Sequence, residues 1–248
     1  MKLITLGTGH GNFTVSRYKS ASLLLAGGRQ YLIDCGSPAA ASMTRLGYEN
    51  REVRAIFNTH MHLDHIGGLP DMLYAIVRYP VTGQHTDVYL AEERTAELYA
   101  FMHAVHLSEH PEYLAFHAVT PGRIFDDGVL RVTAIPTDHI ARVPGTPPIT
   151  FAFLMEAEGK RVLFSGDLRG DFCDFPGETG ADVLVCEATH YKPEAAAPVF
   201  REKAYKRLIF NHVHDPWHGE EGERKLLSYY AELPYPVEIA HDLEEFDL

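Results

Sequence analysis

The apolar residues of this chain fall into short runs that glycine, proline, asparagine or aspartate residues interrupt. Runs of this length, rich in branched and aromatic side chains, predict β-strands. The expected strands are Leu3–Leu6, Ala21–Leu25, Tyr31–Asp34, Ala55–Asn58, Asp87–Leu90, Val129–Ile135, Thr150–Ala157, Lys160–Phe164, Asp182–Cys186, Arg207–Asn211 and Val237–Ala240. Because Gly27 and Gly28 separate two of these runs, we expect a hairpin between them.

Other segments repeat apolar residues every three or four positions, which is the spacing of an amphipathic helix. The expected helices are Pro38–Leu46, Leu69–Arg78, Glu92–His106 and Glu220–Glu232. The early chain is rich in strands, and helices then interleave with them, so the pattern predicts an α/β fold with mixed sheets covered by helices. No repeat or long linker divides the chain, and we expect residues 1–248 to form one domain.

Composition and charge narrow the classes of protein that remain. Hydrophobic residues make up 46% of the chain and charged residues 23%, which fits a globular protein rather than a disordered, collagen-like or coiled-coil one. The 22 Lys and Arg residues against 34 Asp and Glu residues give a net charge of -12. Because a negative chain repels long polyanions, we expect no long nucleic acid as a partner.

The sequence also predicts a compartment. The opening residues contain too short an apolar run for a signal peptide, and no stretch approaches the roughly 18 apolar residues of a membrane span. Cys35, Cys173 and Cys186 are scattered and odd in number, which argues against a disulfide framework and against a thiolate metal site. We therefore expect a cytoplasmic protein that does not bind a membrane. Whether it forms a homodimer stays open.

Potential metal ligands are densest directly after the expected strand Ala55–Asn58, where His60, His62, Asp64 and His65 follow one another closely. Side chains two positions apart in an extended backbone point the same way, so His60 and His62 can share one ion. Asp64 and His65 stand where the chain turns into a helix, so they can reach a second ion. Such a buried cluster would be unfavourable without a metal, because each polar group needs a partner.

The string His60-x-His62-x-Asp64-His65 resembles the signature of the metallo-β-lactamase superfamily. Three later residues, each at the end of an expected strand, are similar to the family's remaining ligand motifs and follow in the family's order: His139, Asp167 and His212. Asp34 resembles the early aspartate that supports the ligand histidines. The resemblance covers nearly the whole chain. It implies a four-layer αβ/βα sandwich, in which two mixed β-sheets are flanked by helices, with a dinuclear metal site along one edge.

The resemblance also implies how the ligands are shared. The first metal would be held by His60, His62 and His139, the second by Asp64, His65 and His212, and Asp167 would bridge the two. Nitrogen and oxygen donors without thiolates suit zinc, and also manganese or iron, and we expect two zinc ions. Ions with open positions lower the pKa of bound water to about 7 and so provide a hydroxide nucleophile. The cleft would then carry a net charge of about +1, which favours a small anionic substrate and, best of all, a phosphodiester.

Two local features indicate a branch of the superfamily. The third motif lacks the Gly-His pair of thioester, lactone and β-lactam hydrolases, and the segment Glu187-Ala188-Thr189 resembles that of tRNase Z and related phosphodiesterases. In that group the glutamate orients a histidine that acts as general acid, but its usual Gly-His-Ser-Thr string is absent here. The acid could be His190, His214 or His218. We expect Asp64, Glu187, His190 and His214 as the catalytic set of a metal-dependent hydrolase of small cyclic or nucleotide-like phosphodiesters.

Several alternatives remain open at this point. The chain could hydrolyse carboxylic esters or lactones, oxidise sulfur compounds with a single iron, or bind metal without activity. No arm for gripping tRNA is visible, because the connection between Leu69–Arg78 and Asp87–Leu90 is short.

Some polar residues outside the ligand motifs have two possible roles. Arg169 and Lys192 are either phosphate contacts or, as we favour, ordinary surface charges. Tyr99, His103, His106 and His110 would form one stripe of a helix. We expect that stripe to be a solvated face rather than a second metal site or a lid.

Overall fold

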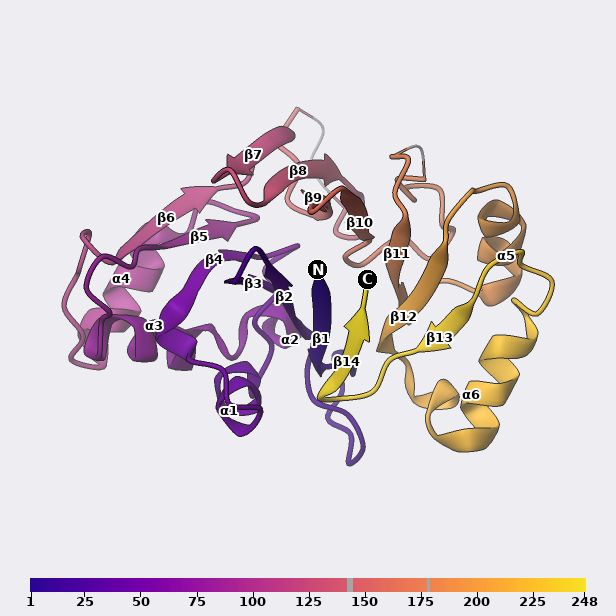
Figure 1. The fold of residues 1–248 in the computed structure, drawn as a ribbon, viewed down its shortest axis with the longest axis horizontal. Coiled ribbons are helices and arrows are strands. Elements are labelled where there is room, and N and C mark those ends of the chain that lie inside the picture. The colour runs from indigo at the N-terminus through magenta and orange to yellow at the C-terminus, as the bar shows by residue number, and fades with distance from the viewer. Residues whose placement is uncertain (142–144, 178) are drawn as a thin grey trace.

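The computed structural model describes residues 1–141, 145–177 and 179–248, and it places them in two seven-stranded sheets that pack face to face (Figure 1). The first sheet has the order β14 (Glu244–Asp247), β1 (Lys2–Gly7), β2 (Ala21–Ala26), β3 (Arg29–Ile33), β4 (Val53–Phe57), β5 (Thr86–Leu90) and β6 (Leu114–Ala118). The second has the order β13 (Val237–Ile239), β12 (Arg207–Val213), β11 (Val183–Ala188), β10 (Lys160–Phe164), β9 (Phe151–Ala157), β8 (Arg131–Pro136) and β7 (Gly122–Asp126).

Helices cover the outer face of each sheet. The first sheet carries α1 (Ala39–Arg45), α3 (Leu69–Arg78) and α4 (Thr95–Ala104), and the second carries α5 (Pro193–Arg201) and α6 (Gly219–Ser228). A four-residue helix, α2 (Leu63–Ile66), follows β4. The expected four-layer αβ/βα sandwich of two mixed sheets is confirmed.

Each sheet is antiparallel on one side and parallel on the other. Strands β14, β1, β2 and β3 pair antiparallel, whereas β3 to β6 pair parallel. The expected hairpin joins β2 to β3, and both of its glycines have positive φ, 53° at Gly27 and 76° at Gly28. Parallel neighbours need a longer crossover, and α1, α3 and α4 provide it for the first sheet.

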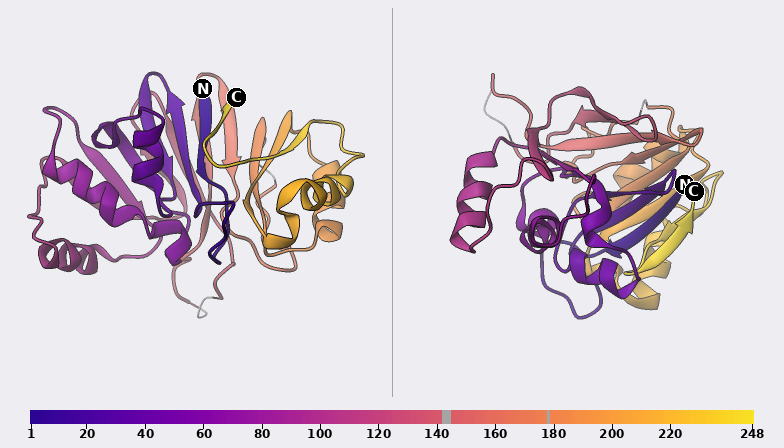
Figure 2. Two further views of the ribbon diagram at one scale, coloured as in Figure 1. Left: turned by 90° about the horizontal axis from the view of Figure 1, so that it is seen from below. Right: turned by 60° about the vertical axis from the view of Figure 1, so that its left-hand side comes forward.

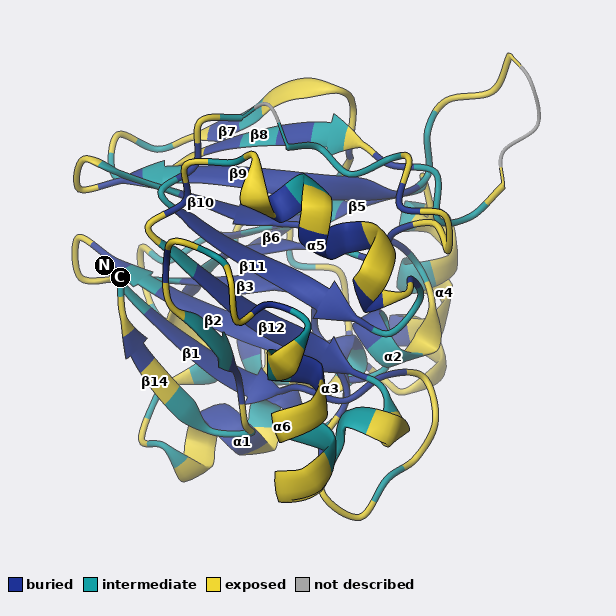
Figure 3. Ribbon diagram, turned by 90° about the vertical axis from the view of Figure 1, so that its right-hand side faces the viewer, coloured by how far each residue is buried: buried dark blue, intermediate teal, exposed yellow. Residues whose placement is uncertain are grey.

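Apolar side chains fill three layers of core. Between the sheets lie fully buried aromatic residues such as Phe57 and Phe153, while Met72 and Phe200 pack on the two outer faces. Burial of each such side chain stabilises the fold by about 1.5–3 kcal/mol. Because most strands are covered on both faces, they are buried along most of their length (Figure 3), which explains why they appear in the sequence as continuous apolar runs.

All the expected strands and helices are present, with ends shifted by a few residues. The apolar pattern did not predict four further strands and α-helices. They are β6, β7, β14 and α5. Strand β14 contains three acidic residues and lies at a sheet edge, where only one neighbour needs to be matched. Helix α5 contains Pro198, which reads as a helix breaker. A polar strand or a helix that contains proline lacks the apolar run or spacing from which strands and helices are predicted.

The prediction of one helical stripe from Tyr99 to His110 is wrong. Helix α4 ends at Ala104, and His106 has a φ of 62°, which no continuing helix allows. His103 and His106 are exposed, as a solvated face requires.

The first and last strands lie side by side (Figure 2), because β1 pairs antiparallel with β14 from Lys2 to Thr5. In the described part of the chain, every helix is too short or too polar to cross a bilayer.

Candidate metal centre

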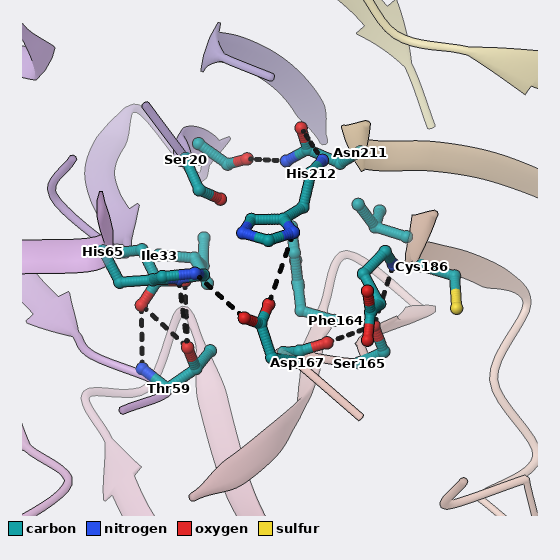
Figure 4. A pocket seen from close by; sticks show the side chains of 15 residues that line it. Ser20, Ile33, Thr59, His65, Phe164, Ser165, Asp167, Cys186, Asn211 and His212 are labelled. Atoms are coloured by element: carbon teal, nitrogen blue, oxygen red, sulfur yellow. Dashed lines mark hydrogen bonds and ion pairs between the residues drawn. The ribbon is translucent and has the colours of Figure 1, made fainter. Parts of the chain in front are cut away.

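The four ligand motifs of the sequence meet around the carboxylate of Asp167. Its Oδ2 atom lies 3.6 Å from Nε2 of His60 and 3.4 Å from Nε2 of His65. Nε2 of His139 is 3.7 Å from the same oxygen, and Nδ1 of His212 is 3.6 Å from Oδ1. Figure 4 shows this carboxylate between the rings of His65 and His212. Asp167 is therefore placed to contact two neighbouring cations.

The donor atoms form two groups with Asp167 at their boundary. One group contains His60, His62, His139 and Asp167, and the other contains Asp64, His65 and His212. Within each group the donor atoms lie within 4.8 Å of one another. A further group contains Asp167, Glu187, His190 and His212, so Asp167 and His212 each belong to two groups.

The local backbone explains why the string after β4 can form such a centre. His62 is still extended, with φ −66° and ψ 147°, and α2 begins directly after it, so Asp64 and His65 leave the strand direction that His60 and His62 share. The ring of His65 nevertheless stays close to that of His60, with the two centroids 4.1 Å apart. The turn packs against the end of β3, where a Cβ atom on Gly36 would lie 2.2 Å from the carbonyl oxygen of Asp64. Only glycine fits that approach.

Hydrogen bonds outside the centre orient three of the ligand rings. Nδ1 of His65 lies 2.7 Å from Oδ2 of Asp34, which fits the supporting role that the resemblance implied for that aspartate. Nδ1 of His139 lies 3.2 Å from the carbonyl oxygen of Leu168, and Nδ1 of His212 lies 3.1 Å from Oγ1 of Thr189. Partners of this kind fix the ring and its tautomer, so that the other nitrogen faces the metal.

Thr59 links this outer layer together. Its amide nitrogen donates to Oδ1 of Asp34 at 2.8 Å, and its hydroxyl lies 3.1 Å from Nδ1 of His60. Thr59 was not singled out from the sequence, although it stands directly before His60, and Thr189 was named only as part of the Glu187-Ala188-Thr189 segment. Backbone strain marks the same places, because Asp34 and His212 have positive φ values of 59° and 49°.

Two buried atoms test whether the centre fits a metal. Among the residues that the structure describes, neither Nε2 of His65 nor Oδ1 of Asp167 has a hydrogen-bond partner. A buried polar atom without a partner is unfavourable by about 1–3 kcal/mol. In addition, Nε2 of His60 and Nδ1 of His62 lie only 3.0 Å apart. Lone pairs directed at a common point are the arrangement that a cation satisfies.

The pKa directions agree with this fit. Burial lowers the pKa of His60 well below its ordinary value, so its ring is a neutral donor. Burial also lowers the pKa of His65, but the charges of Asp167 and Asp34 outweigh it and raise that pKa well above the ordinary value. For Asp167, burial raises the pKa, but His212 and His65 outweigh it and hold the pKa well below its usual range. The centre thus attracts positive charge, and divalent cations fit it.

Glu187 and His190 border the donors. Glu187 ends β11 in a buried position, where its Oε1 accepts the amide N–H of Leu168 at 2.7 Å. Its Oε2 accepts the amide N–H groups of Thr189 and His190 at 3.0 and 2.9 Å, and it lies 2.9 Å from Nδ1 of His190. Burial lowers the pKa of His190, but the hydrogen bond and charge of Glu187 outweigh it and raise that pKa to about 9.

The structure separates the three histidines considered as general acid. The ring centroid of His190 is 4.4 Å from that of His139 and 5.5 Å from that of His212. His214 instead lies beside His10, with ring centroids 4.9 Å apart, and Nε2 of His218 donates to the carbonyl oxygen of Val213. The ring of His214 thus contacts His10, whereas that of His190 contacts two of the metal donors, and the catalytic role expected of His214 stays a prediction.

The two candidate phosphate contacts also differ. Lys192 is exposed at the start of α5. Arg169 pairs with Asp171 at 2.9 Å and lines the same groove as His139 and His190. Only Arg169 is placed beside the donors.

Comparisons with known proteins agree with the geometry. The family model described as Anti-Pycsar protein Apyc1 matches residues 1–175. Ribonuclease Z of Mycobacterium sp. (strain KMS) is 31% identical over 286 residues that cover 100% of this chain and 96% of that protein. Anti-Pycsar protein Apyc1 of Paenibacillus sp. (strain J14) is 26% identical over 258 residues that cover 99% of this chain and 92% of that protein.

Solved structures show the same fold. The metallo-β-lactamase fold protein YhfI from Bacillus subtilis matches with a TM-score of 0.76 and 18% identity, over 99% of this chain and 98% of that one. The short form of human tRNase Z matches with a TM-score of 0.73 and 22% identity, over 100% and 99%. Together with the family match over residues 1–175 and the identity of 31% with Ribonuclease Z, these findings show that the chain belongs to the Anti-Pycsar protein Apyc1 family and has the metallo-β-lactamase fold.

Proposed function

We propose that this metal-dependent phosphodiesterase hydrolyses small phosphodiesters, cyclic or nucleotide-like, and that His190 is its general acid. The pairing of His190 with a buried, fully hydrogen-bonded Glu187 beside the seven donors carries the proposal. A hydrolase of activated esters has less need of such an acid, because its leaving group has a low pKa and departs without a proton.

The seven donors would hold two divalent cations, and zinc is the ion we propose. The first would be bound by His60, His62 and His139, the second by Asp64, His65 and His212, with Asp167 between them. Five imidazoles and two carboxylates without a thiolate suit zinc well, and manganese or iron are further candidates. When bound, such a pair activates water near neutral pH and neutralises charge on phosphoryl oxygens.

The chain's own residues position the proton that the leaving group needs. Glu187 cannot turn, because three backbone N–H groups hold its two oxygens. It fixes Nδ1 of His190 as a donor, so the second proton of the charged ring is on Nε2, from which it can pass to a leaving oxygen. With a pKa of about 9, this ring stays protonated at neutral pH. Arg169 borders the same groove and would contact a phosphate oxygen if it leaves Asp171.

The size of the substrate is inferred from what the relatives have and this chain lacks. The name Ribonuclease Z points to RNA, which goes against our expectation of no long nucleic acid. However, that alignment extends over 286 residues, at least 38 more than the 248 of this chain, whereas the alignment with Apyc1 extends over 258. A net charge of -12 also opposes binding of a long polyanion. Both facts support a small substrate.

We also propose how the chain is organised into domains, where it is located and how it assembles. Residues 1–248 would act as one domain, because β1 pairs with β14 at the two ends of the chain. A cytoplasmic location is supported by free thiols at Cys35, Cys173 and Cys186. A homodimer stays a prediction.

A substrate panel tests the proposed function. The zinc-loaded protein is assayed with bis(4-nitrophenyl) phosphate, nucleoside 3′,5′-cyclic monophosphates, a structured RNA and 4-nitrophenyl acetate. We expect turnover of the two small diesters, loss of it on chelation, and little cleavage of RNA. Cleavage of RNA alone would overturn the substrate size, and cleavage of the acetate alone would favour a carboxylic ester hydrolase. Oxygen uptake with one iron per chain would favour the dioxygenase.

The role of His190 has a sharper test. The variant His190→Ala should lower kcat for a cyclic nucleotide by about 10²–10⁴-fold, because the alkoxide leaving group loses its proton donor. The loss should be much smaller for a nitrophenyl diester, whose leaving group needs no proton. Metal content should match that of the wild type, and the exposed His103→Ala serves as a control. Equal losses with both leaving groups would show that His190 has a structural role instead.

A further inference from the structure

A second histidine cluster lies outside the seven donors. His10 stands on the loop after β1, and His214 and Asp215 follow the end of β12. Their potential ligand atoms lie within 4.8 Å of one another. Nε2 of His10 is 3.5 Å from Oδ2 of Asp215, and the rings of His10 and His214 meet edge to face at 77°. Residues more than 200 positions apart in the sequence thus converge on one point.

His10 is the unusual member of the cluster. Its residue is only 4% exposed, yet among the described residues neither of its ring nitrogens has a hydrogen-bond partner. Most buried polar side chains in a folded protein are hydrogen-bonded, and an isolated one is unfavourable. A lone pair on this ring needs a hydrogen-bond donor or a cation, and no donor lies within hydrogen-bond distance of it among the residues that the structure describes.

The backbone around His10 is held firmly. Lys19 donates to the carbonyl oxygens of His10, Gly11 and Asn12 at 3.1, 2.5 and 2.6 Å. Gly9 forms β-bridges with both Lys19 and Val213, which ties the loop to the end of β12. The backbone that carries His10 is therefore fixed beside the end of β12.

The chemistry of the cluster favours a cation over an anion. Asp215 brings a carboxylate, which would repel a phosphate, and its side chain is 51% exposed, so an ion can enter from solvent. Two imidazoles and a carboxylate are a common donor set for zinc and other transition metals. His218 lies at the rim, with Nδ1 3.8 Å from Oδ1 of Asp215.

We propose that His10, His214 and Asp215 form a third metal site, which binds a single Zn²⁺ or similar transition-metal cation apart from the dinuclear centre. Three protein ligands leave at least one coordination position for water or for an oxygen of a bound ligand. The site stands next to the centre without sharing its donors. A Cβ atom on Gly11 would lie 3.5 Å from Oδ2 of Asp64, so the loop that carries His10 lies against one of the donors of the centre.

Counting metal in matched variants tests this site. The full chain is saturated with Zn²⁺, dialysed against metal-free buffer and analysed for metal per chain. Asp215→Asn and His214→Gln should each bind one zinc fewer than the wild type. His241→Gln is the matched control, because it removes an exposed histidine that also has carboxylate neighbours, and it should bind the wild-type number. The test compares the zinc content of each variant with that of the wild type, so its result does not depend on how many ions the dinuclear centre retains.

Cobalt provides an independent readout. In Co²⁺-loaded protein, the visible absorption of the wild type minus that of Asp215→Asn should give the bands of one histidine-ligated ion. Asp215 is exposed and its asparagine has the same shape, so this variant should fold even if a substitution of His10 does not. Equal metal content and equal spectra in wild type, Asp215→Asn and His214→Gln would overturn the third site. Loss of two ions in either variant would also overturn it, because the residues would then serve the dinuclear centre.

Discussion

The dinuclear centre and the His10 cluster are both built from imidazoles and carboxylates, but the chain holds them in different ways. At the centre, hydrogen bonds act on the rings themselves, because Asp34 accepts from the ring of His65 and Oγ1 of Thr189 lies beside Nδ1 of His212. In the His10 cluster, the ring of His10 has no such partner, and Lys19 holds the backbone instead. Rings oriented by acceptors bind metal in a fixed geometry, so we expect tighter binding at the centre than in the cluster.

The largest effect should come from Asp167, which serves both halves of the centre. Asp167→Ala should remove both ions of the centre and lower phosphodiesterase activity by about 10³-fold or more, because the carboxylate that contacts both groups is lost. Metal analysis and kcat measure this. The third site should keep its ion in this variant, so loss of all metal would contradict the independence of the two sites.

Removing a hydrogen bond outside the centre should have a smaller effect. Asp34→Asn changes the acceptor of His65 without touching a metal, and it should weaken zinc binding about 10- to 100-fold. Competition with a chromophoric chelator measures the affinity. If Asp34→Asn bound zinc as tightly as the wild type, ring orientation would not explain the difference between the two clusters.

Replacing Lys19 tests whether this side chain holds the loop of the His10 cluster in place. Lys19→Met removes a charged donor from three carbonyl oxygens, and it should lower the free energy of unfolding by about 2 kcal/mol and weaken the third site. Urea unfolding of the metal-free protein measures the first effect. Lys2→Met is the control, because Lys2 forms a surface ion pair with Glu245, and exposed pairs of this kind contribute little to stability. A Lys19→Met protein as stable as this control would show that the loop is held by other contacts.

Asp127 provides a comparison with the metal donors, because N–H groups of the chain form hydrogen bonds to its carboxylate. Burial raises its pKa, but the N–H groups of Leu130 and Val129 and the guanidinium of Arg29 outweigh it and lower the pKa. A lowered pKa in the folded state stabilises the protein above the unfolded value of about 3.9, and this contribution disappears as the pH falls through the lower folded value.

The variant Asp127→Asn should therefore be less stable than the wild type by about 1 kcal/mol at neutral pH, and the difference should shrink below about pH 4. Its metal content should equal that of the wild type, because Asp127 belongs to neither cluster. Unfolding free energies between pH 3 and pH 7 measure this. A difference that grows towards low pH would have the wrong sign for a carboxylate with a lowered pKa.

Much of the fold was predictable because its signals are local. Strands buried on both faces, such as β2 and β11, consist of apolar residues along most of their length. The string from His60 to His65 was equally readable, because an extended segment followed by a helix turns neighbouring ligands to two sides. Elements with little apolar signal were missed, as β14 shows, because its place in the sheet depends on pairing with β1 at the other end of the chain.

The sequence by itself therefore determined the donor types, their order and the layers of the sandwich. Only the tertiary structure decided which histidine joins which cluster. His190 and His214 look alike in the sequence, yet one is held by Glu187 beside the metal donors and the other meets His10 from the opposite end of the chain. The physical reason is that side-chain spacing is set by the local backbone, whereas contacts between distant residues depend on how the two sheets pack and on which buried polar atoms find partners.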